Sequence, residues 1–479
     1  MACAILWFRR DLRLADHPAL QAALTAGYRI VPVYIHAPEE ETPWPPGAAS
    51  RAWLHRSLRS LDAGLHGLGS RLIVRRGGSI AKLDELIRQT GAEAVFWNRL
   101  YEPAAIARDM RVKQALKASD VRAESFNGAL LAEPWTVATG AGEPYRVFTP
   151  FWKNAGQHVR GQRPVAAPKS LDPVPESIAG ESLDSLDSLD SLELQPAAGW
   201  DRKFWRHWQP GETGAAESLD AFIEGAAHGY RTQRDFPDRT GSSRLSPHLH
   251  FGEISPRQIV SQVLSQPWPA NVQADIGHFI DELGWREFSH HLMYHFPRSV
   301  AENLNPKFDR FAWAAADADS LDRWQRGRTG VPLVDAGMRQ LWHTGWMHNR
   351  VRMVVASFLT KNLRYHWTYG ARWFWDTLLD ADLANNTQGW QWSAGTGADA
   401  APYFRIFSPV AQAEKFDSQG KYIQRWVPEL AKLPPPALFA PWEHPELARR
   451  LAPDYPPVPI VDPKASRADA LAALASSRR

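Results

Sequence analysis

The first part of the chain alternates between short apolar runs and segments in which apolar residues recur at helical spacing. The runs, rich in β-branched and aromatic residues, are AILWF (4–8), RIVPVYI (29–35), RLIVRR (71–76) and EAVFWN (93–98). Helical segments begin near His17, Ala48, Ile80 and Pro103. Strands that alternate with helices predict a parallel sheet with helices on both faces. We therefore expect a doubly wound, Rossmann-like α/β domain over residues 1–135.

The pattern changes twice in the rest of the chain. Residues 136–199 are rich in Pro, Ser, Ala and Asp and contain a Ser-Leu-Asp repeat between Ser182 and Leu192, which predicts an interdomain linker. From residue 200 to residue 479, apolar residues recur at helical spacing between Pro and Gly, with little strand signal. This pattern predicts a second domain that is all-α.

Composition narrows the class of protein. The 479 residues are 44% hydrophobic, enough for two or three domains with buried cores. The single cysteine, Cys3, excludes a disulfide framework and suits a reducing compartment, so we expect a cytoplasmic protein. No run approaches the roughly 20 apolar residues that span a bilayer, and no membrane association is expected. A net charge of +3 permits nucleic acid as a partner without requiring it.

The α/β domain has a possible ligand crevice. No G-x-G-x-x-G motif follows the first strand, so a conventional NAD site is not expected. Ligands of parallel sheets gather at the carboxyl ends of the strands, which places Arg9, Arg10, His36 and Glu102 around such a crevice. Taken singly, each of these side chains is typical of a solvent-exposed loop.

The segment from Asp380 to Pro409 is the most informative part of the helical half. Its polar side chains can hydrogen-bond the edge of a planar ring system, and its tryptophans can stack on aromatic faces or pass electrons. These residues are Asp380, Asp382, Asn385, Asn386, Trp390 and Trp392. The alternative interpretation is an irregular loop over a helical core. Trp390, with Trp367 and Trp313 further back, could form a relay from a buried oxidant to the surface.

A second segment, from Tyr230 to Ser246, offers groups for a diphosphate. Backbone N–H groups and hydroxyls around Gly241 and Ser242 lie beside Arg234 and Arg244, just before a predicted helix. A serine-capped helix start would explain the same residues without a ligand.

Two further helical segments carry candidate binding side chains. Between Phe279 and Ser289, helical spacing places Glu282, Trp285 and Arg286 on one face of a helix. There a carboxylate beside an aromatic ring could bind the edge of a nucleobase. The ordinary alternative is a Glu–Arg pair with a packed tryptophan.

The other segment runs from Gly345 to Leu359. There Asn349 and Met353 share a helix face, flanked by Arg350 and Arg352. They could form a wall for a ring edge, although core packing is the usual role of methionine. A buried Arg352 would need an acid, and Asp380 is the candidate.

Taken together, these segments identify a family. LWFRRDLRLADHPAL, SSRLSP, GWMHNRVRM, the 380–392 stretch and APYFRIFSP resemble the DNA photolyase and cryptochrome family across nearly the whole chain, and its bacterial cyclobutane pyrimidine dimer (CPD) photolyases above all. The resemblance implies an antenna-binding α/β domain, a helical domain that binds FAD, and light-driven repair of UV-damaged DNA by reduced FAD. This activity is that of a deoxyribodipyrimidine photo-lyase, a carbon–carbon lyase, acting as a monomer. The alternatives are a cryptochrome-like blue-light photoreceptor that signals through protein partners, and a non-photoactive flavoprotein.

The resemblance also assigns residues to roles. The cofactor-binding positions are Tyr230, Ser242, Ser243, Arg244, Leu245, Ser246, Phe279, Arg352, Asp380, Asp382 and Asn386. The lesion and DNA positions are Arg234, Glu282, Trp285, Arg286, Asn349, Arg350, Met353 and Trp392. The catalytic positions are Glu282, which would stabilise the pyrimidine radical anion, Asn386, and the photoreduction chain Trp390, Trp367 and Trp313.

Two positions discriminate between members of this family. Asn386 corresponds to the residue that faces flavin N5, where plant cryptochromes typically have Asp and animal ones Cys. Enzymes for the six-four photoproduct have paired histidines near the positions of Asn349 and Met353, whereas this chain has only His348, out of register.

The antenna and metal content are also expected from the sequence. Glu102 corresponds to an acid of folate-binding members, and Trp44 could stack on an antenna in a loop that departs from the folate loop of well-known bacterial enzymes. The resemblance favours methenyltetrahydrofolate, with 8-hydroxy-5-deazaflavin as the alternative. No metal site is expected.

Overall fold

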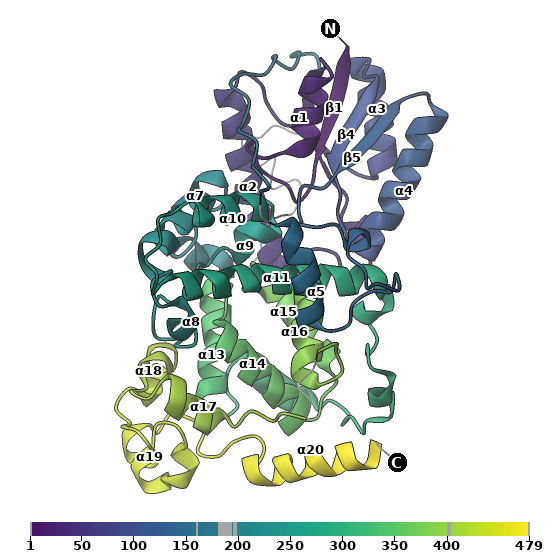
Figure 1. Ribbon diagram of the computed structural model, residues 1–479. Helices are drawn as coiled ribbons and strands as arrows, with labels where there is room; N and C mark the ends of the chain where they lie inside the picture. The colour runs from purple at the N-terminus through teal and green to yellow at the C-terminus, as the bar shows by residue number, and fades with distance from the viewer. Residues whose placement is uncertain (1, 160, 181–193, 195–198, 400–403, 478–479) are drawn as a thin grey trace. The chain divides into compact units, whose positions relative to one another are not determined.

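The computed structural model describes residues 2–159, 161–180, 194, 199–399 and 404–477 (Figure 1). The predicted Ser-Leu-Asp repeat lies outside these residues. The chain forms two compact units, the first from Met1–Gly225 and Ser243–Pro297, the second from Ala226–Ser242 and Arg298–Arg479. The boundaries at residues 135 and 200 stay predictions. No helix among the described residues is both long and apolar enough to cross a membrane.

A five-stranded parallel sheet forms the centre of the N-terminal part of the first unit. From edge to edge its strands are β3 (Ile73–Arg76), β2 (Arg29–His36), β1 (Cys3–Phe8), β4 (Ala94–Asn98) and β5 (Arg122–Phe126). Four strands occur where the apolar runs predicted them. The fifth, RAESF, was missed because an edge strand that is only partly buried carries no apolar run.

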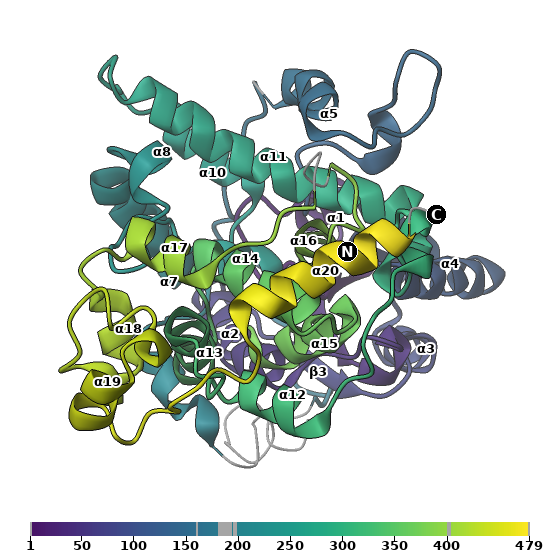
Figure 2. The ribbon, with the colours of Figure 1, turned by 90° about the horizontal axis from the view of Figure 1, so that it is seen from below.

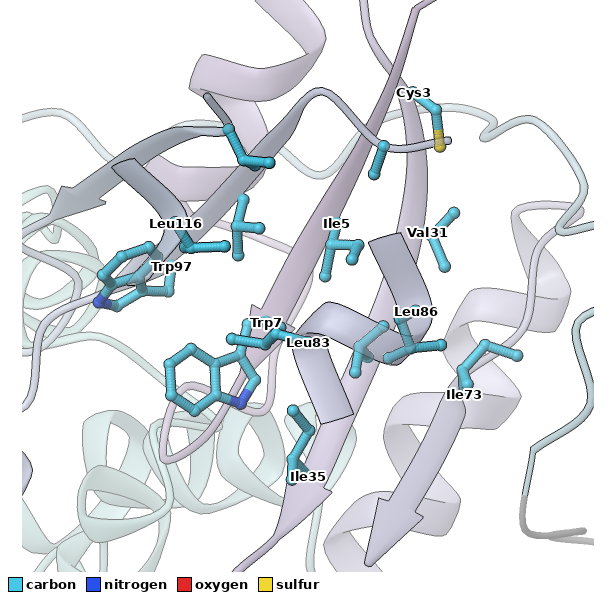
Figure 3. Close-up of a cluster of buried hydrophobic side chains, with 14 of the residues drawn as sticks. Cys3, Ile5, Trp7, Val31, Ile35, Ile73, Leu83, Leu86, Trp97 and Leu116 are labelled. Carbon is cyan, nitrogen blue, oxygen red and sulfur yellow. The ribbon is translucent and has the colours of Figure 1, made fainter. Parts of the chain in front are cut away.

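Helices cover both faces of this sheet. Alternate residues of β1, such as Ile5 and Trp7, share a core with Leu83 of α3 (Ser79–Thr90) and Leu116 of α4 (Pro103–Ala118) (Figure 3). The opposite face packs against α1 (Pro18–Thr25). β1 is buried at every position because both of its faces are covered, and this explains why its sequence is a continuous apolar run.

The strand order reverses between β1 and β4, where parallel sheets usually bind ligands. A polar network fills this position. Arg9 donates to both carboxylate oxygens of Asp109 and to the carbonyl of Asn98, and His17 contacts Asp11 at 2.9 Å. The prediction that Arg9 is a solvent-exposed loop residue is wrong, because Asp109 neutralises it in the interior.

Among the described residues of the first unit, one further α-helix lies between β2 and β3, and the others come after β5 in the chain. In chain order these helices are α2 (Ala48–Gly67), α5 (Phe148–Ala155), α7 (Glu212–Ala221), α9 (Ser246–His250), α10 (Pro256–Leu264) and α11 (Gln273–His295). Figure 1 shows α5 beside the long helix α11, and the two helices are in contact.

The described part of the second unit is helical, as predicted. Its α-helices are α8 (Tyr230–Gln233), α12 (Ala318–Gln325), α13 (Pro332–Thr344), α14 (Asn349–Ser357), α15 (Trp367–Thr377), α16 (Leu383–Ala394), α17 (Pro409–Phe416), α18 (Lys421–Trp426), α19 (Pro445–Leu451) and α20 (Pro463–Ser477). The last, yellow in Figure 2, packs against the 3-10 helix η7 (Pro306–Arg310) and the π-helix η8 (Phe358–Asn362).

Candidate functional site

An ion pair joins two of the predicted cofactor-binding residues. Arg352 of α14 donates from Nη2 to both oxygens of Asp380, at 3.1 and 2.8 Å, and from Nε to the carbonyl of Met347 at 2.7 Å. The Asp380 side chain is only 5% exposed, so the charge of the carboxylate is compensated inside the protein. The predicted partnership of Arg352 and Asp380 is confirmed.

The start of α16 fixes the polar side chains that follow Asp380. Asp382 is the N-cap residue, and its Oδ1 accepts hydrogen bonds from the backbone and side-chain N–H groups of Asn385 at 2.8 and 2.7 Å. One position on, Asn386 donates from Nδ2 to the carbonyl of Ala371 on α15 at 2.9 Å. This bond sets the orientation of the amide and leaves its Oδ1 as an acceptor for a ligand N–H group.

Trp390, on α16, lies in the interior of the second unit, 2% exposed, with its side chain packed against α15. Its ring contacts Phe374 at 4.9 Å and the fully buried Trp324 at 6.2 Å, measured between ring centroids. The six-membered ring rests on Gly370 of α15, where a Cβ atom would be only 2.0 Å from Trp390 Cη2. Gly370 is therefore required by this packing.

The other two tryptophans of the predicted relay differ in their surroundings. Trp367, at the start of α15, is fully buried and donates from Nε1 to Asn303 Oδ1 at 2.9 Å. Trp313 is half-buried, and its Nε1 has no hydrogen-bond partner among the described residues. The ring of His366 is 5.1 Å from Trp313 and 5.5 Å from Trp367, so one imidazole links the two indoles.

The predicted phosphate segment divides between the two units. Tyr230, Arg234 and Ser242 belong to the second unit, and the remaining positions, Ser243, Arg244, Leu245 and Ser246, belong to the first. A Cβ atom at Gly241 would lie 2.4 Å from the carbonyl oxygen of Gln233, so the segment needs glycine to fold back on the end of α8.

Within the first unit, the guanidinium of Arg244 lies 4.2 Å from the ring centroid of Trp208. Burial lowers the pKa of Arg244. A cation in such surroundings interacts strongly with an anion, because little water screens it.

The α11 helix carries four predicted residues of the first unit. Phe279 is buried against Phe222, with ring centroids 4.2 Å apart. Glu282 lies 3.9 Å from His278 Nε2. Arg286 donates to the carbonyl of Ala129 at 2.9 Å and also contacts Glu287.

Trp285, the fourth, is half-buried and stacked on Phe148. These side chains have specific partners in the first unit, which differ from the simple Glu282–Arg286 pair that spacing alone suggests.

The second unit carries the remaining predicted lesion-binding residues. Asn349 begins α14 and is exposed, and Met353, one turn later, is half-buried. Trp392 is half-buried, and its ring centroid is 6.4 Å from that of Phe407. His348 is the N-cap of α14, accepting at Nδ1 from the N–H of Arg350, and burial lowers the pKa of His348 to about 4. His348 thus has a structural role, consistent with its position out of register.

A cationic groove of about 490 Å³ lies in the second unit. Its lining includes four cations and one acid, which are Arg350, Arg405, Lys415, Arg467 and Asp235. Arg350 donates to Asp235 Oδ1 at 2.7 Å and stacks over Phe416 at 4.4 Å. Phe404 and Phe407 also line the groove, so positive charge and aromatic surface occur together.

The predicted antenna residues are close to each other in the first unit. Glu102 pairs with Arg10 at 2.5 Å, Arg10 is 3.8 Å from Glu41, and the carbonyl of Glu41 accepts from the backbone N–H of Trp44. Glu102 and His36 are buried, so the prediction that each is solvent-exposed is wrong. Glu102 Oε2 has no hydrogen-bond partner among the described residues, which leaves a buried acceptor for a ligand N–H group.

Sequence reasoning missed several residues around these sites. Asn303 carries no local signal, because its partner Trp367 is distant in the chain. The same holds for His366, whose contact with Trp313 appears only in three dimensions. Phe148 had a signal that was overlooked: Phe148 and Trp152 in VFTPFW are spaced by one helical turn, so both rings face the same side. Among the described residues, no group of three or more His, Cys, Asp or Glu side chains could hold a metal ion.

Comparison with known proteins defines the class. Residues 4–171 match the family described as DNA photolyase, and residues 279–476 match the FAD binding domain of DNA photolyase. An α/β domain followed by this helical domain makes the protein a two-domain flavoprotein. The chain belongs to the DNA photolyase and cryptochrome family, as predicted.

The chain is similar to both photolyases and cryptochromes of this family. The chain is 46% identical to the deoxyribodipyrimidine photo-lyase of Agrobacterium fabrum, with 100% of this chain and 98% of the relative covered. It is 39% identical to cryptochrome-1 of Arabidopsis thaliana, with 96% and 68% covered. The crystal structure of a bacterial class III photolyase from Agrobacterium tumefaciens matches with a TM-score of 0.92 and 45% identity, over 100% of this chain and 98% of that one.

Proposed function

We propose that this protein uses blue light to repair cyclobutane pyrimidine dimers in DNA. The observation that carries the proposal is the amide at position 386, held by the carbonyl of Ala371 and placed on the same helix as Trp392. An amide accepts a hydrogen bond without adding negative charge, so it is compatible with an anionic reduced flavin. The aspartate that plant cryptochromes have at this position would add such a charge.

The residues of the helical part suit a bound FAD. Asp380, Asp382 and Asn386 provide acceptors near one another along the chain, and Arg352 compensates the charge of the first of them. Ser242 to Ser246, with Arg244, would hold the diphosphate, and Tyr230 and Phe279 would pack on the cofactor. FAD held by these residues in its reduced form would supply, on excitation by light, the one electron needed to open the cyclobutane ring.

The lesion would bind outside the duplex. A dimer stacks and pairs poorly, so extruding it costs less free energy than extruding normal bases. Trp285 and Trp392 would contact its faces, Asn349 and Met353 would line its edge, and Glu282 would hydrogen-bond the pyrimidine and stabilise the radical anion.

The cationic side chains would bind the phosphates around the lesion. Arg234, Arg286 and Arg350 are the expected contacts, and Arg350 also lines the cationic groove of the second unit together with Arg405 and Arg467. We expect affinity for DNA to fall as salt concentration rises, because phosphate binding releases counterions.

An antenna chromophore would bind beside Glu102 and Trp44. The buried Oε2 of Glu102 supports a ligand with an N–H donor, which a methenyl folate has in its pterin ring. An 8-hydroxy-5-deazaflavin is the alternative. The absorption spectrum of the purified protein would distinguish these chromophores.

The repair activity is tested directly. Holoprotein with chemically reduced flavin is mixed with an oligonucleotide that contains a thymine dimer and is illuminated with blue light. We expect loss of the dimer only in the light, measured by chromatography of the oligonucleotide. Failure to remove dimers from both single- and double-stranded DNA would contradict the proposal and favour the cryptochrome-like photoreceptor, to which the relationship with cryptochrome-1 points.

Replacing Trp390 by Phe should slow light-driven reduction of the bound flavin. A benzene ring is much harder to oxidise than an indole, so the first electron donor of the proposed chain is lost. We expect the rate to fall about tenfold or more, which corresponds to a barrier higher by at least about 1.4 kcal/mol. The measurement is the flavin absorbance under illumination with an external reductant.

Repair by Trp390→Phe protein that was reduced chemically beforehand serves as the control and should persist. An unchanged photoreduction rate in this variant would exclude Trp390 as the donor.

A further inference from the structure

The ring of Trp285 is covered on one face by another aromatic ring. Phe148, the first residue of α5, lies with its ring centroid 3.8 Å from that of Trp285 and with an angle of 10° between the planes. Both side chains are half-buried. A further stacking partner of Trp285 would therefore have to use the opposite face of the ring.

Trp152 fixes α5 to α11 one turn beyond Phe148. Its ring lies nearly parallel to that of Phe148, at 15°, and its Nε1 donates to Asp281 Oδ1 at 2.8 Å. It also rests on Gly284, the neighbour of Trp285, where a Cβ atom would come within 2.5 Å of Trp152 Cδ2. A third contact joins Phe151 to Phe288, with ring centroids 5.1 Å apart.

We propose that α5 is a backing element for lesion recognition, in which Phe148 is a positioning residue that holds Trp285 in the orientation that stacks on the flipped pyrimidine dimer. The inference rests on the proposed function, because it requires Trp285 to contact the lesion. The inference adds Phe148, which belongs to a different helix from Trp285. In this role Phe148 touches neither the lesion nor FAD.

The physical reason is preorganisation. A tryptophan on an open helix surface loses side-chain freedom when a ligand stacks on it, and this loss weakens binding. Stacking on Phe148 restricts Trp285 before the lesion arrives, and parallel aromatic faces also stabilise each other. The bond to Asp281 and the contact with Gly284 keep Phe148 itself in place.

Removing the ring of Phe148 should weaken binding of damaged DNA selectively. For Phe148→Ala we expect the Kd for an oligonucleotide with one thymine dimer to rise about tenfold, or about 1.4 kcal/mol. The Kd for the undamaged oligonucleotide, which depends on phosphate contacts, should change little. Fluorescence anisotropy of labelled DNA with the holoprotein in the dark measures both constants without repair.

Further variants separate ring stacking from general packing. Phe148→Tyr keeps a flat ring and should bind the lesion like the unmodified protein, whereas Phe148→Leu keeps bulk without a flat face and should resemble Phe148→Ala. Gly284→Ala would displace Trp152 and should also weaken lesion binding. Gly277→Ala lies on the same helix in open space, serves as the matched control, and should have no effect.

The outcomes are distinct. Tighter lesion binding by Phe148→Ala would show that Phe148 blocks the face of Trp285 that binds the lesion. Unchanged lesion binding by folded Phe148→Ala and Phe148→Leu would show that Phe148 does not position Trp285. Either result overturns the inference. If Phe148→Ala fails to fold, as judged by circular dichroism, the lesion affinities of Phe148→Tyr and Phe148→Leu decide whether the ring of Phe148 is needed. If the unmodified protein does not distinguish damaged from undamaged DNA, the proposed function itself fails.

Discussion

Gly370→Ala is expected to lower the free energy of unfolding by about 2–3 kcal/mol, because overpacking a close-packed interior has costs of this size. The new Cβ atom would lie 2.0, 2.4 and 2.5 Å from three atoms of the Trp390 ring. The ring has little room to retreat, since Phe374 and the fully buried Trp324 pack against it. Thermal or urea denaturation followed by circular dichroism measures the change.

The chain provides a matched control for this substitution. Gly389 precedes Trp390 on α16 and is exposed, and a Cβ atom added there would have no neighbour within 4 Å among the described residues. Gly389→Ala should be neutral or stabilise the protein by up to about 1 kcal/mol, because alanine favours the helix. If Gly370→Ala were as stable as Gly389→Ala, the close packing of α15 on Trp390 would be refuted.

Displacement of Trp390 should also be visible in function. The indole that is proposed to donate the first electron would be moved by the new methyl group, so Gly370→Ala protein that still folds should show slower flavin photoreduction. Gly389→Ala should retain the normal rate. This pair of variants therefore links the packing of one glycine to the proposed electron path.

The fold was largely predictable because its signals are local. Apolar runs located four strands of the sheet, and the helix starts predicted near residues 17, 48, 80 and 103 lie within one residue of the observed ones. The edge strand β5 was not predictable, because partial burial places little demand on its sequence. Arg9 was misjudged for a different reason, since its neutralising partner Asp109 lies far along the chain.

The site was predictable where one physical demand pointed to one residue. A buried Arg352 needed an acid, and Asp380 was the candidate in the neighbouring segment. Spacing alone failed for Arg286, which donates to the carbonyl of Ala129, because helical periodicity does not report contacts made by another segment. The partners of Trp285 and Trp367, namely Phe148 and Asn303, are likewise determined by tertiary packing.

Burial of Lys361 lowers the stability of the folded protein, and the sequence alone does not reveal this burial. Lys361 lies in η8, is 1% exposed, and its ammonium is 3.3 Å from the ring centroid of Phe404. No carboxylate among the described residues forms an ion pair with it. Burial lowers the pKa of Lys361 from 10.5 to about 7. A buried charge without an ion partner destabilises the folded state.

Lys361→Met should therefore raise the free energy of unfolding at pH 7. The difference between a pKa of 10.5 and one of about 7 sets an upper bound of roughly 5 kcal/mol. The attraction between an ammonium and an aromatic face is worth about 1–2 kcal/mol and offsets part of this. We expect a gain of about 3 kcal/mol, because methionine fills similar space without a charge.

The gain should depend on pH with a definite sign. Below about pH 7 the lysine is protonated in both folded and unfolded states, so the full cost is present. Between pH 7 and 10.5 the unfolded chain binds a proton that the folded protein has lost, and the unmodified protein therefore gains stability as pH rises. The advantage of Lys361→Met should shrink over this range, as measured by denaturation at pH 7 and pH 10. Lys432→Met, at an exposed position, is the control and should show no such trend. A Lys361→Met protein less stable than the unmodified one at pH 7 would mean that the contact with Phe404 outweighs the cost of burial.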